Sequence, residues 1–239
     1  MININYDTHI PVGKKVKLSG ILHDNHYSYG IFDEDMYLAS IGMIPMDQHA
    51  TFIHGLERSH KLSEQKNCSL SDLFIHVPTK DSPVTSDHNK LEHFFDEGIA
   101  IVYDVKFNSG LDTRHFSNLI NKYYFGKLGT VMHLHFLERK FFIYIADDGQ
   151  MLFYNQFDIE NEADVAYFTN LAMQSLFMEE AKLNIVLSGL IDIKSAMHNV
   201  LTMYFSNISF AEIQGMKLLN DDRFKVSYYF DHYINMTHQ

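Results

Sequence analysis

One order of predicted secondary structure occurs twice in this chain, and this repetition restricts the possible folds more than any other feature. Three short strands, a helix, a strand, a helix and a strand are predicted from about Val16 to Asp104. The same order is predicted again from about Val131 to Glu212. Antiparallel hairpins followed by helical crossovers are typical of mixed sheets covered by helices, so the predicted fold class is α/β. We therefore expect two βββαβαβ lobes with a cleft between them, where ligands commonly bind.

The first repeat begins with a predicted hairpin. Val16, Leu18 and Leu22 follow the alternating pattern of a strand. Asp24-Asn25 come next, and both residue types tolerate the backbone conformation of a tight turn. Two more strands are predicted, and Pro45 ends the second of them because proline cannot donate a ladder hydrogen bond.

Two helices and two strands complete the prediction for this repeat. A helix is predicted over residues 49–66 and a short strand over 73–77. The helical spacing of apolar residues within 91–95 predicts a second helix over about 86–98. Residues 98–103 form a continuous apolar run, which favours a buried parallel strand.

The second repeat carries stronger local signals. Three strands are predicted between Val131 and Phe157, and Asp148-Gly149 between the second and third is a typical hairpin turn. Asn161 followed by Asp164 is a variant of the capping box and predicts the start of a helix. A strand, a helix and a closing strand are then expected within residues 183–213.

These elements suggest a division of the chain into consecutive parts. We expect a leader over residues 1–15 and the first lobe over 16–110. A bridging helix is expected within 111–130, and the second lobe with a C-terminal tail over 131–239.

Composition excludes several classes of function. The net charge of −11 disfavours nucleic-acid binding, because phosphate backbones repel an acidic chain. No apolar run approaches the ~20 residues of a membrane-spanning helix, and no secretory signal begins the sequence. The single cysteine, Cys68, excludes an intrachain disulfide, so we expect a cytoplasmic protein. Because no membrane-spanning run is present, we expect no membrane partner.

Several short motifs resemble those of a known family. The chain is similar to an uncharacterised bacterial family, a domain of unknown function whose fold is the duplicated ribonuclease-H-like fold of actin-like ATPases. The resemblance covers most of the chain from about residue 16. It implies the fold only, because the family has no established activity. The motifs that carry it are Val131-Met132-His133-Leu134-His135, Leu152-Phe153-Tyr154-Asn155-Gln156-Phe157, Asp164 with Tyr167-Phe168, and Leu187-Ser188-Gly189.

The resemblance suggests where a nucleotide would bind between the lobes. Actin-like ATPases hold phosphates with two hairpin turns that resemble Asp-x-Gly, in which glycine lets backbone N–H groups approach the oxygens. The corresponding turns here contain Asp24-Asn25 and Glu138-Arg139, and neither contains a glycine. The adenosine position corresponds to Ser188-Gly189, with one glycine where the ATPases have a pair. These six residues are the candidates for a site in the cleft, and a phosphate-cradling loop is not predicted.

Two histidines are weak candidates for a metal site. His133 and His135 are two residues apart on a predicted strand and therefore share one face. His23 or Glu138 could supply a third ligand. The alternative is that both histidines pack against aromatic neighbours on the strand 141–144, so no metal is assigned.

Three functions stay open on the sequence alone. The favoured one is a non-catalytic actin-like protein, a pseudo-ATPase, that binds a partner protein or its own copy. The abundant Tyr and Phe favour it because they are good interface residues. The second is a nucleotide-binding ATPase or kinase with degenerate loops, in which Asp24 and Glu138 hold Mg²⁺. The third is a small-molecule or metal-binding regulator. No cofactor is expected for the favoured function.

Overall fold

The computed structural model describes residues 6–7, 11–23, 26–71, 74–78, 89–93, 98–104, 112–179, 183–215, 217–218 and 226–238. They belong to two compact units, which are described separately. The first unit lies within residues 1–122, 214–223 and 231–239, and the second within 123–213 and 224–230. The lobe boundaries expected from the sequence stay a prediction.

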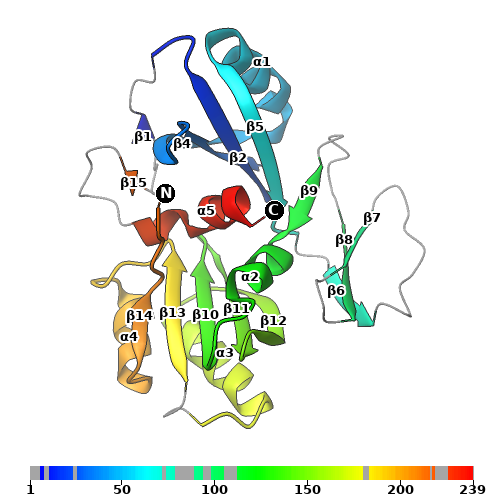
Figure 1. Ribbon diagram of the computed structural model, residues 1–239. Helices are drawn as coiled ribbons and strands as arrows, with labels where there is room; N and C mark the ends of the chain where they lie inside the picture. Colours follow the sequence, from blue (N-terminus) through cyan, green and yellow to red (C-terminus); the bar gives the residue numbers. More distant parts are fainter. Residues whose placement is uncertain are drawn as a thin grey trace. The chain divides into compact units, whose positions relative to one another are not determined.

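The first unit is built on a mixed sheet with the strand order β1-β4-β3-β2-β5-β9, and β15 pairs with β4 (Figure 1). Its strands are β1 (Tyr6–Asp7), β2 (Lys15–His23), β3 (His26–Phe32), β4 (Tyr37–Pro45), β5 (Lys61–Ser69), β9 (Thr113–His115) and β15 (Lys217–Leu218). Its helices are η1 (Met46–Gln48) and α1 (His49–Ser59), with most of α2 (Phe116–Tyr124) and of α5 (Phe230–Thr237).

A separate antiparallel sheet of three strands follows β5 in the chain. Its order is β6 (Phe74–Pro78), β8 (Ile99–Asp104) and β7 (Asn89–His93).

The second unit is a five-stranded mixed sheet with the order β12-β11-β10-β13-β14. The strands are β10 (Thr130–Phe136), β11 (Lys140–Asp147), β12 (Gln150–Asp158), β13 (Asn184–Gly189) and β14 (Ile208–Phe210). Helices α3 (Glu162–Ser175) and α4 (Ala196–Tyr204) and the short η4 (Val226–Tyr229) complete it. Apolar side chains of β10, such as Leu134, pack with Val165 of α3 and Leu201 of α4 in one core.

The two large sheets share one order of strands. In both, a central strand pairs antiparallel with a hairpin partner on one side and parallel with a later strand on the other. The pairs are β2 with β3 and β5, and β10 with β11 and β13. The predicted α/β class with two mixed sheets is therefore confirmed. Among the described helices, none has both the length and the apolar character needed to cross a membrane.

The helix predicted over residues 49–66 is wrong in its second half. Helix α1 ends at Ser59, and residues 61–69 form β5, which pairs in parallel with β2. The polar side chains of β5 find partners in the sheet: Ser63 Oγ donates to the carbonyl of Val16 at 2.9 Å, and Asn67 Oδ1 accepts from Tyr27 at 3.0 Å. Pairing with a distant strand thus overrides the weak helical pattern of this segment.

The second helix predicted in the first repeat is also wrong. Residues 89–93 form strand β7, and residues 94–97 lie outside the described part of the chain. The strand predicted over 98–103 exists as β8, but it pairs antiparallel with both neighbours. In the described residues, the small sheet therefore occupies the position of the second crossover helix, and the first lobe lacks the full βββαβαβ order.

The local signals of the second repeat are confirmed. Asp148 and Gly149 have φ angles of 49° and 79°, the two positive values that a type I′ turn needs. Asn161 Oδ1 accepts from the N–H of Ala163, and Asp164 Oδ2 accepts from the N–H of Asn161 at 3.0 Å. The hydrogen bonds from Asn161 and Glu160 lower the pKa of Asp164, as expected for a carboxylate in a capping box.

Within the first unit, α5 covers a polar face of the sheet. His232 Nδ1 lies 3.0 Å from Ser19 Oγ, and Asn235 Nδ2 donates to the same oxygen at 2.8 Å. His232 Nε2 lies 3.1 Å from Ser28 Oγ, and Lys66 Nζ donates to the carbonyl of Met236 at 2.7 Å. Helix α5 is thus held to β2 by buried hydrogen bonds and to β3 and β5 by partly buried ones.

Candidate functional site

The turn between β10 and β11 lacks the backbone geometry of a phosphate loop. The N–H of Leu137 donates to the carbonyl of Lys140 at 2.8 Å, and the carbonyl of Arg139 accepts from Ile159 at 2.8 Å. One common type of anion-binding concavity alternates right- and left-handed residues and therefore contains a positive φ. Neither Glu138 nor Arg139 has one. The corresponding turn of the first unit, with Asp24-Asn25, lies outside the described residues.

Gly189 allows the backbones of β13 and β10 to lie close together. It has a φ of 78°, and a Cβ atom at this position would press into the carbonyl oxygen of Phe136 on β10. The same carbonyl accepts from the N–H of Leu190 at 2.8 Å. A side-chain-free residue is therefore required here by the neighbouring backbone, independently of any ligand.

Ser188 joins the two candidate histidines in one hydrogen-bonded group. In the register of β10 and β13, His135 lies opposite Ser188. Ser188 Oγ is 2.6 Å from His133 Nε2 and 2.8 Å from His135 Nδ1, and Tyr124 Oη is 2.7 Å from His133 Nδ1. We call these four residues the buried histidine group. They lie on the sheet face opposite the α3–α4 core, because strand side chains alternate in direction.

The hydrogen bonds of His133 suit a neutral ring. Burial lowers the pKa of His133 well below its usual value, and the nearby His135 and Lys127 lower it further. A neutral ring has one N–H and one lone pair. With Tyr124 donating to Nδ1, His133 donates from Nε2 to Ser188, and Ser188 donates to His135. One direction of donation thus satisfies the three links that join Tyr124, β10 and β13 within the second unit.

Most ring nitrogens of the two candidate histidines are used in hydrogen bonds. Both ring nitrogens of His133 and one of His135 already take part in hydrogen bonds. Within the described ranges, no three His, Cys, Asp or Glu side chains come together as ligands. Glu138 lies in the turn after β10, and His23 lies at the end of β2 in the first unit.

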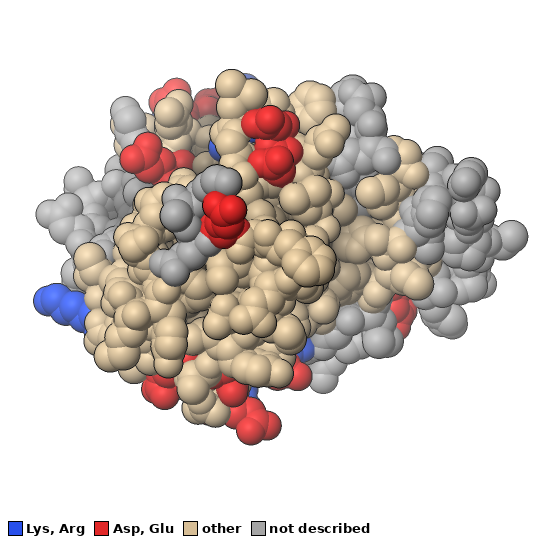
Figure 2. Space-filling model, turned by 90° about the horizontal axis from the view of Figure 1, so that it is seen from below, with Lys and Arg blue, Asp and Glu red and all other residues tan. Residues whose placement is uncertain are grey.

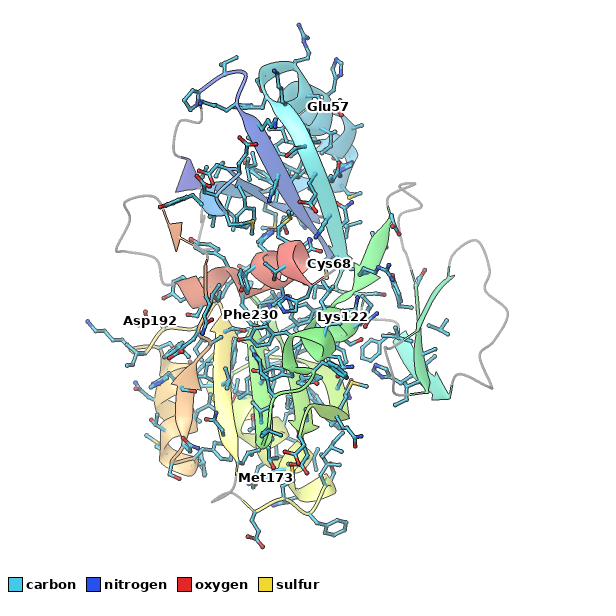
Figure 3. The ribbon with its side chains drawn as sticks, viewed as in Figure 1. Glu57, Cys68, Lys122, Met173, Asp192 and Phe230 are labelled. Atoms are coloured by element: carbon cyan, nitrogen blue, oxygen red, sulfur yellow. The ribbon has the colours of Figure 1, made fainter. Side chains whose placement is uncertain are left out.

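Phe230 covers the histidine group within the second unit. Its ring centroid lies 4.5 Å from that of His133 and 6.2 Å from that of His135, and Tyr123 meets it edge-on at 4.9 Å. Figure 3 labels Phe230 at the first residue of α5. The aromatic packing that the sequence offered as the alternative to a metal is therefore present, and it includes Phe142, 6.1 Å from His135.

Sequence reasoning missed two members of this site. Tyr124 ends α2 and Phe230 begins α5, and neither stands in a motif that marks it. The positions of His133, His135 and Ser188 were found as separate candidates, for a metal and for a nucleotide. Only the pairing of β10 with β13 shows that they belong together.

The outer helices of the second unit present a second candidate surface. Residues 165–178 and 195–211 contain no Asp, Glu, Lys or Arg, although 21% of the chain is charged. Four large side chains stay exposed on these helices, and we call them the uncharged helix face: Tyr167 (62% exposed), Leu171 (45%), Met203 (77%) and Tyr204 (59%). Figure 2 views the molecule from below, with Lys and Arg in blue and with Asp and Glu in red among areas that carry neither.

Comparison with known proteins agrees with the resemblance seen in the motifs. Residues 112–208 match a family of proteins of unknown function, DUF3822. This range contains Tyr124, His133, His135 and Ser188 of the buried histidine group. None of the curated proteins matches the chain.

Two solved structures show the fold. One is a protein with an actin-like ATPase fold and unknown function from Bacteroides thetaiotaomicron, with a TM-score of 0.65 and 14% identity over 97% of this chain and 100% of that one. The other is the PilM–PilN type IV pilus biogenesis complex, with a TM-score of 0.57 and 9% identity over 95% of this chain and 98% of that one. The chain thus has the actin-like fold, and one neighbour of this fold is part of a protein complex.

Proposed function

We propose that this chain is a non-catalytic actin-like protein that acts by binding another protein chain, and that the uncharged helix face binds a second copy of itself. The observation that carries the proposal is the exposure of Tyr167, Leu171, Met203 and Tyr204 in two helical stretches, within residues 165–178 and 195–211, that contain no charged residue. Exposed apolar patches of this kind are typical of protein interfaces.

The charge of the chain restricts which surfaces of two copies can meet. Each copy has a net charge of −11, so two copies repel one another over most approaches. The repulsion is least where both copies present a surface without carboxylates. A two-fold dimer brings the same patch of each copy together, and the uncharged helix face can meet itself in this way.

The described phosphate-turn candidate, at Glu138-Arg139, supports a role without catalysis. The turn of the second unit has no positive φ, and Gly189 is used in strand packing. We also propose that the protein acts in the cytosol, because its single cysteine is buried as Cys68 and no disulfide can form within the chain.

Self-association is expected to depend on the uncharged helix face. Light scattering over about 1 to 100 μM should show a mass that rises from 27.8 kDa towards twice that value, in the range where modest interfaces associate. The double variant Leu171→Lys, Met203→Lys should stay monomeric, because pairing would bury four ammonium groups without partners.

A matched control separates the position of the new charges from their number. Val12 and Ile75 of the first unit are also exposed, at 77% and 58%. The double variant Val12→Lys, Ile75→Lys adds the same charge and should associate like the unaltered protein. A mass of 27.8 kDa at every concentration of the unaltered protein would contradict the proposed second copy.

A further inference from the structure

The second unit contains a pocket of about 540 Å³ that none of the predicted site residues line. Tyr124, Val131, Val186 and Phe210 contribute apolar side chains, and Lys127 has the only amine among the described residues that line the pocket. Polar lining side chains come from Thr130, Asn184 and Ser209. The volume lies in the range of small-molecule sites. The pocket shares Tyr124 with the buried histidine group, whose hydrogen bond to His133 fixes that ring in the wall.

Lys127 is held against aromatic rings instead of a carboxylate. Its Nζ lies 3.3 Å from the centroid of the Tyr123 ring and 4.8 Å from that of Tyr124. None of the ion pairs among the described residues includes Lys127. Partial burial without a counter-ion disfavours the charged form and lowers the pKa of Lys127 to about 8. A neutral amine, which is the nucleophilic form, is then present near neutral pH.

The surrounding charges disfavour an anion as the ligand. Glu212 lines the pocket, and two more carboxylates bind to lining residues. Asp147 Oδ1 accepts from Thr130 Oγ1 at 2.6 Å, and Asp148 Oδ1 accepts from the N–H of Gly129 at 2.7 Å. The three carboxylates outnumber the one amine at this pocket, so a ligand with a carboxylate or phosphate group would be repelled. A neutral molecule with an apolar body suits the walls better.

We propose that this pocket binds a small neutral aldehyde or ketone with an apolar or aromatic body, and that Lys127 Nζ holds it as an imine. The amine nitrogen attacks the carbonyl carbon, a C–N bond forms, and the carbonyl oxygen leaves as water with the two amine protons. No oxidant or reductant is needed. The rings of Tyr123 and Tyr124 then pack against the planar C=N group and against the apolar part of the bound molecule.

Reductive trapping tests the proposal with benzaldehyde as the probe. Cyanoborohydride converts the imine of the full chain at pH 7.5 to a stable benzylamine, and peptide mapping by mass spectrometry gives the occupancy of every lysine. We expect Lys127 to be labelled about tenfold faster than the exposed Lys14 and Lys61, because burial lowers its pKa to about 8 and the pocket holds the probe beside its amine. Lys127→Arg should remove this label and leave the melting temperature unchanged.

Formaldehyde separates binding in the pocket from simple reactivity of the amine, because it has no body for the walls to contact. The ratio of labelling at Lys127 to labelling at Lys61 should be several-fold higher with benzaldehyde than with formaldehyde. Equal ratios for the two aldehydes, or benzaldehyde spread evenly over the exposed lysines, would overturn the proposal.

Discussion

Replacement of Gly189 by alanine is expected to lower the free energy of unfolding of the second unit by about 2–5 kcal/mol. The left-handed backbone at a φ of 78° accounts for about 1–2 kcal/mol of this loss. The new Cβ atom also presses into the carbonyl of Phe136, so β10 and β13 must move apart, and overpacking of this kind typically costs about 1–3 kcal/mol more. Urea unfolding followed by circular dichroism measures the change.

Gly126 provides the matched control for Gly189. It has a similar φ of 74°, and a Cβ atom there would meet nothing within 4 Å. Gly126→Ala should therefore lose only the backbone component, about 1–2 kcal/mol. Equal losses in the two variants would show that the contact with Phe136 is not what requires glycine at position 189.

Acidification from pH 6.5 to 4.5 is expected to destabilise the protein strongly. Burial lowers the pKa of His115 to about 3, and it also lowers the pKa values of His133 and His232. Below pH 6.5 the unfolded chain therefore binds protons that the folded chain does not. The free energy of unfolding consequently decreases as the pH is lowered. At about 1.36 kcal/mol per pH unit, His115 alone loses about 2.7 kcal/mol by pH 4.5.

The variant His115→Asn tests how much of this loss of stability at low pH comes from His115. His115→Asn removes a titrating group and keeps an acceptor near Ser117, whose N–H donates to His115 Nδ1 at 3.2 Å. It should reduce the slope of melting temperature against pH between 6.5 and 4.5. Asp164, whose pKa is lowered from 3.8, loses its contribution only at lower pH and does not interfere. An unchanged slope in this variant would contradict the role of His115.

The second unit was more predictable than the first because its signals are local. Asp148-Gly149 specifies its turn through two positive φ angles, and Asn161 with Asp164 specifies the start of α3. Strand β5 has no such signal. Residues 61–66 are almost all polar, and they form a strand only because β2 pairs with them from elsewhere in the sequence.

The sequence identified most residues of the candidate site, but it did not show how they are arranged in space. His133 and His135 share a face by strand alternation, which the sequence shows. Their link through Ser188 depends on the parallel register of β10 with β13, which no local pattern encodes. No sequence motif marks Lys127. Its chemical environment comes from the rings of Tyr123 and Tyr124, which α2 places beside it.

Thermal unfolding with and without saturating Mg-ATP tests most directly whether this actin-like fold works without a nucleotide. Ligand at about 100 times its dissociation constant would add about 2.7 kcal/mol, which raises the melting temperature of a chain of this size by about 5–10 °C. We predict no change, because the turn at Glu138-Arg139 forms no anion cradle and Gly189 packs against Phe136. A rise of that size would contradict the central claim.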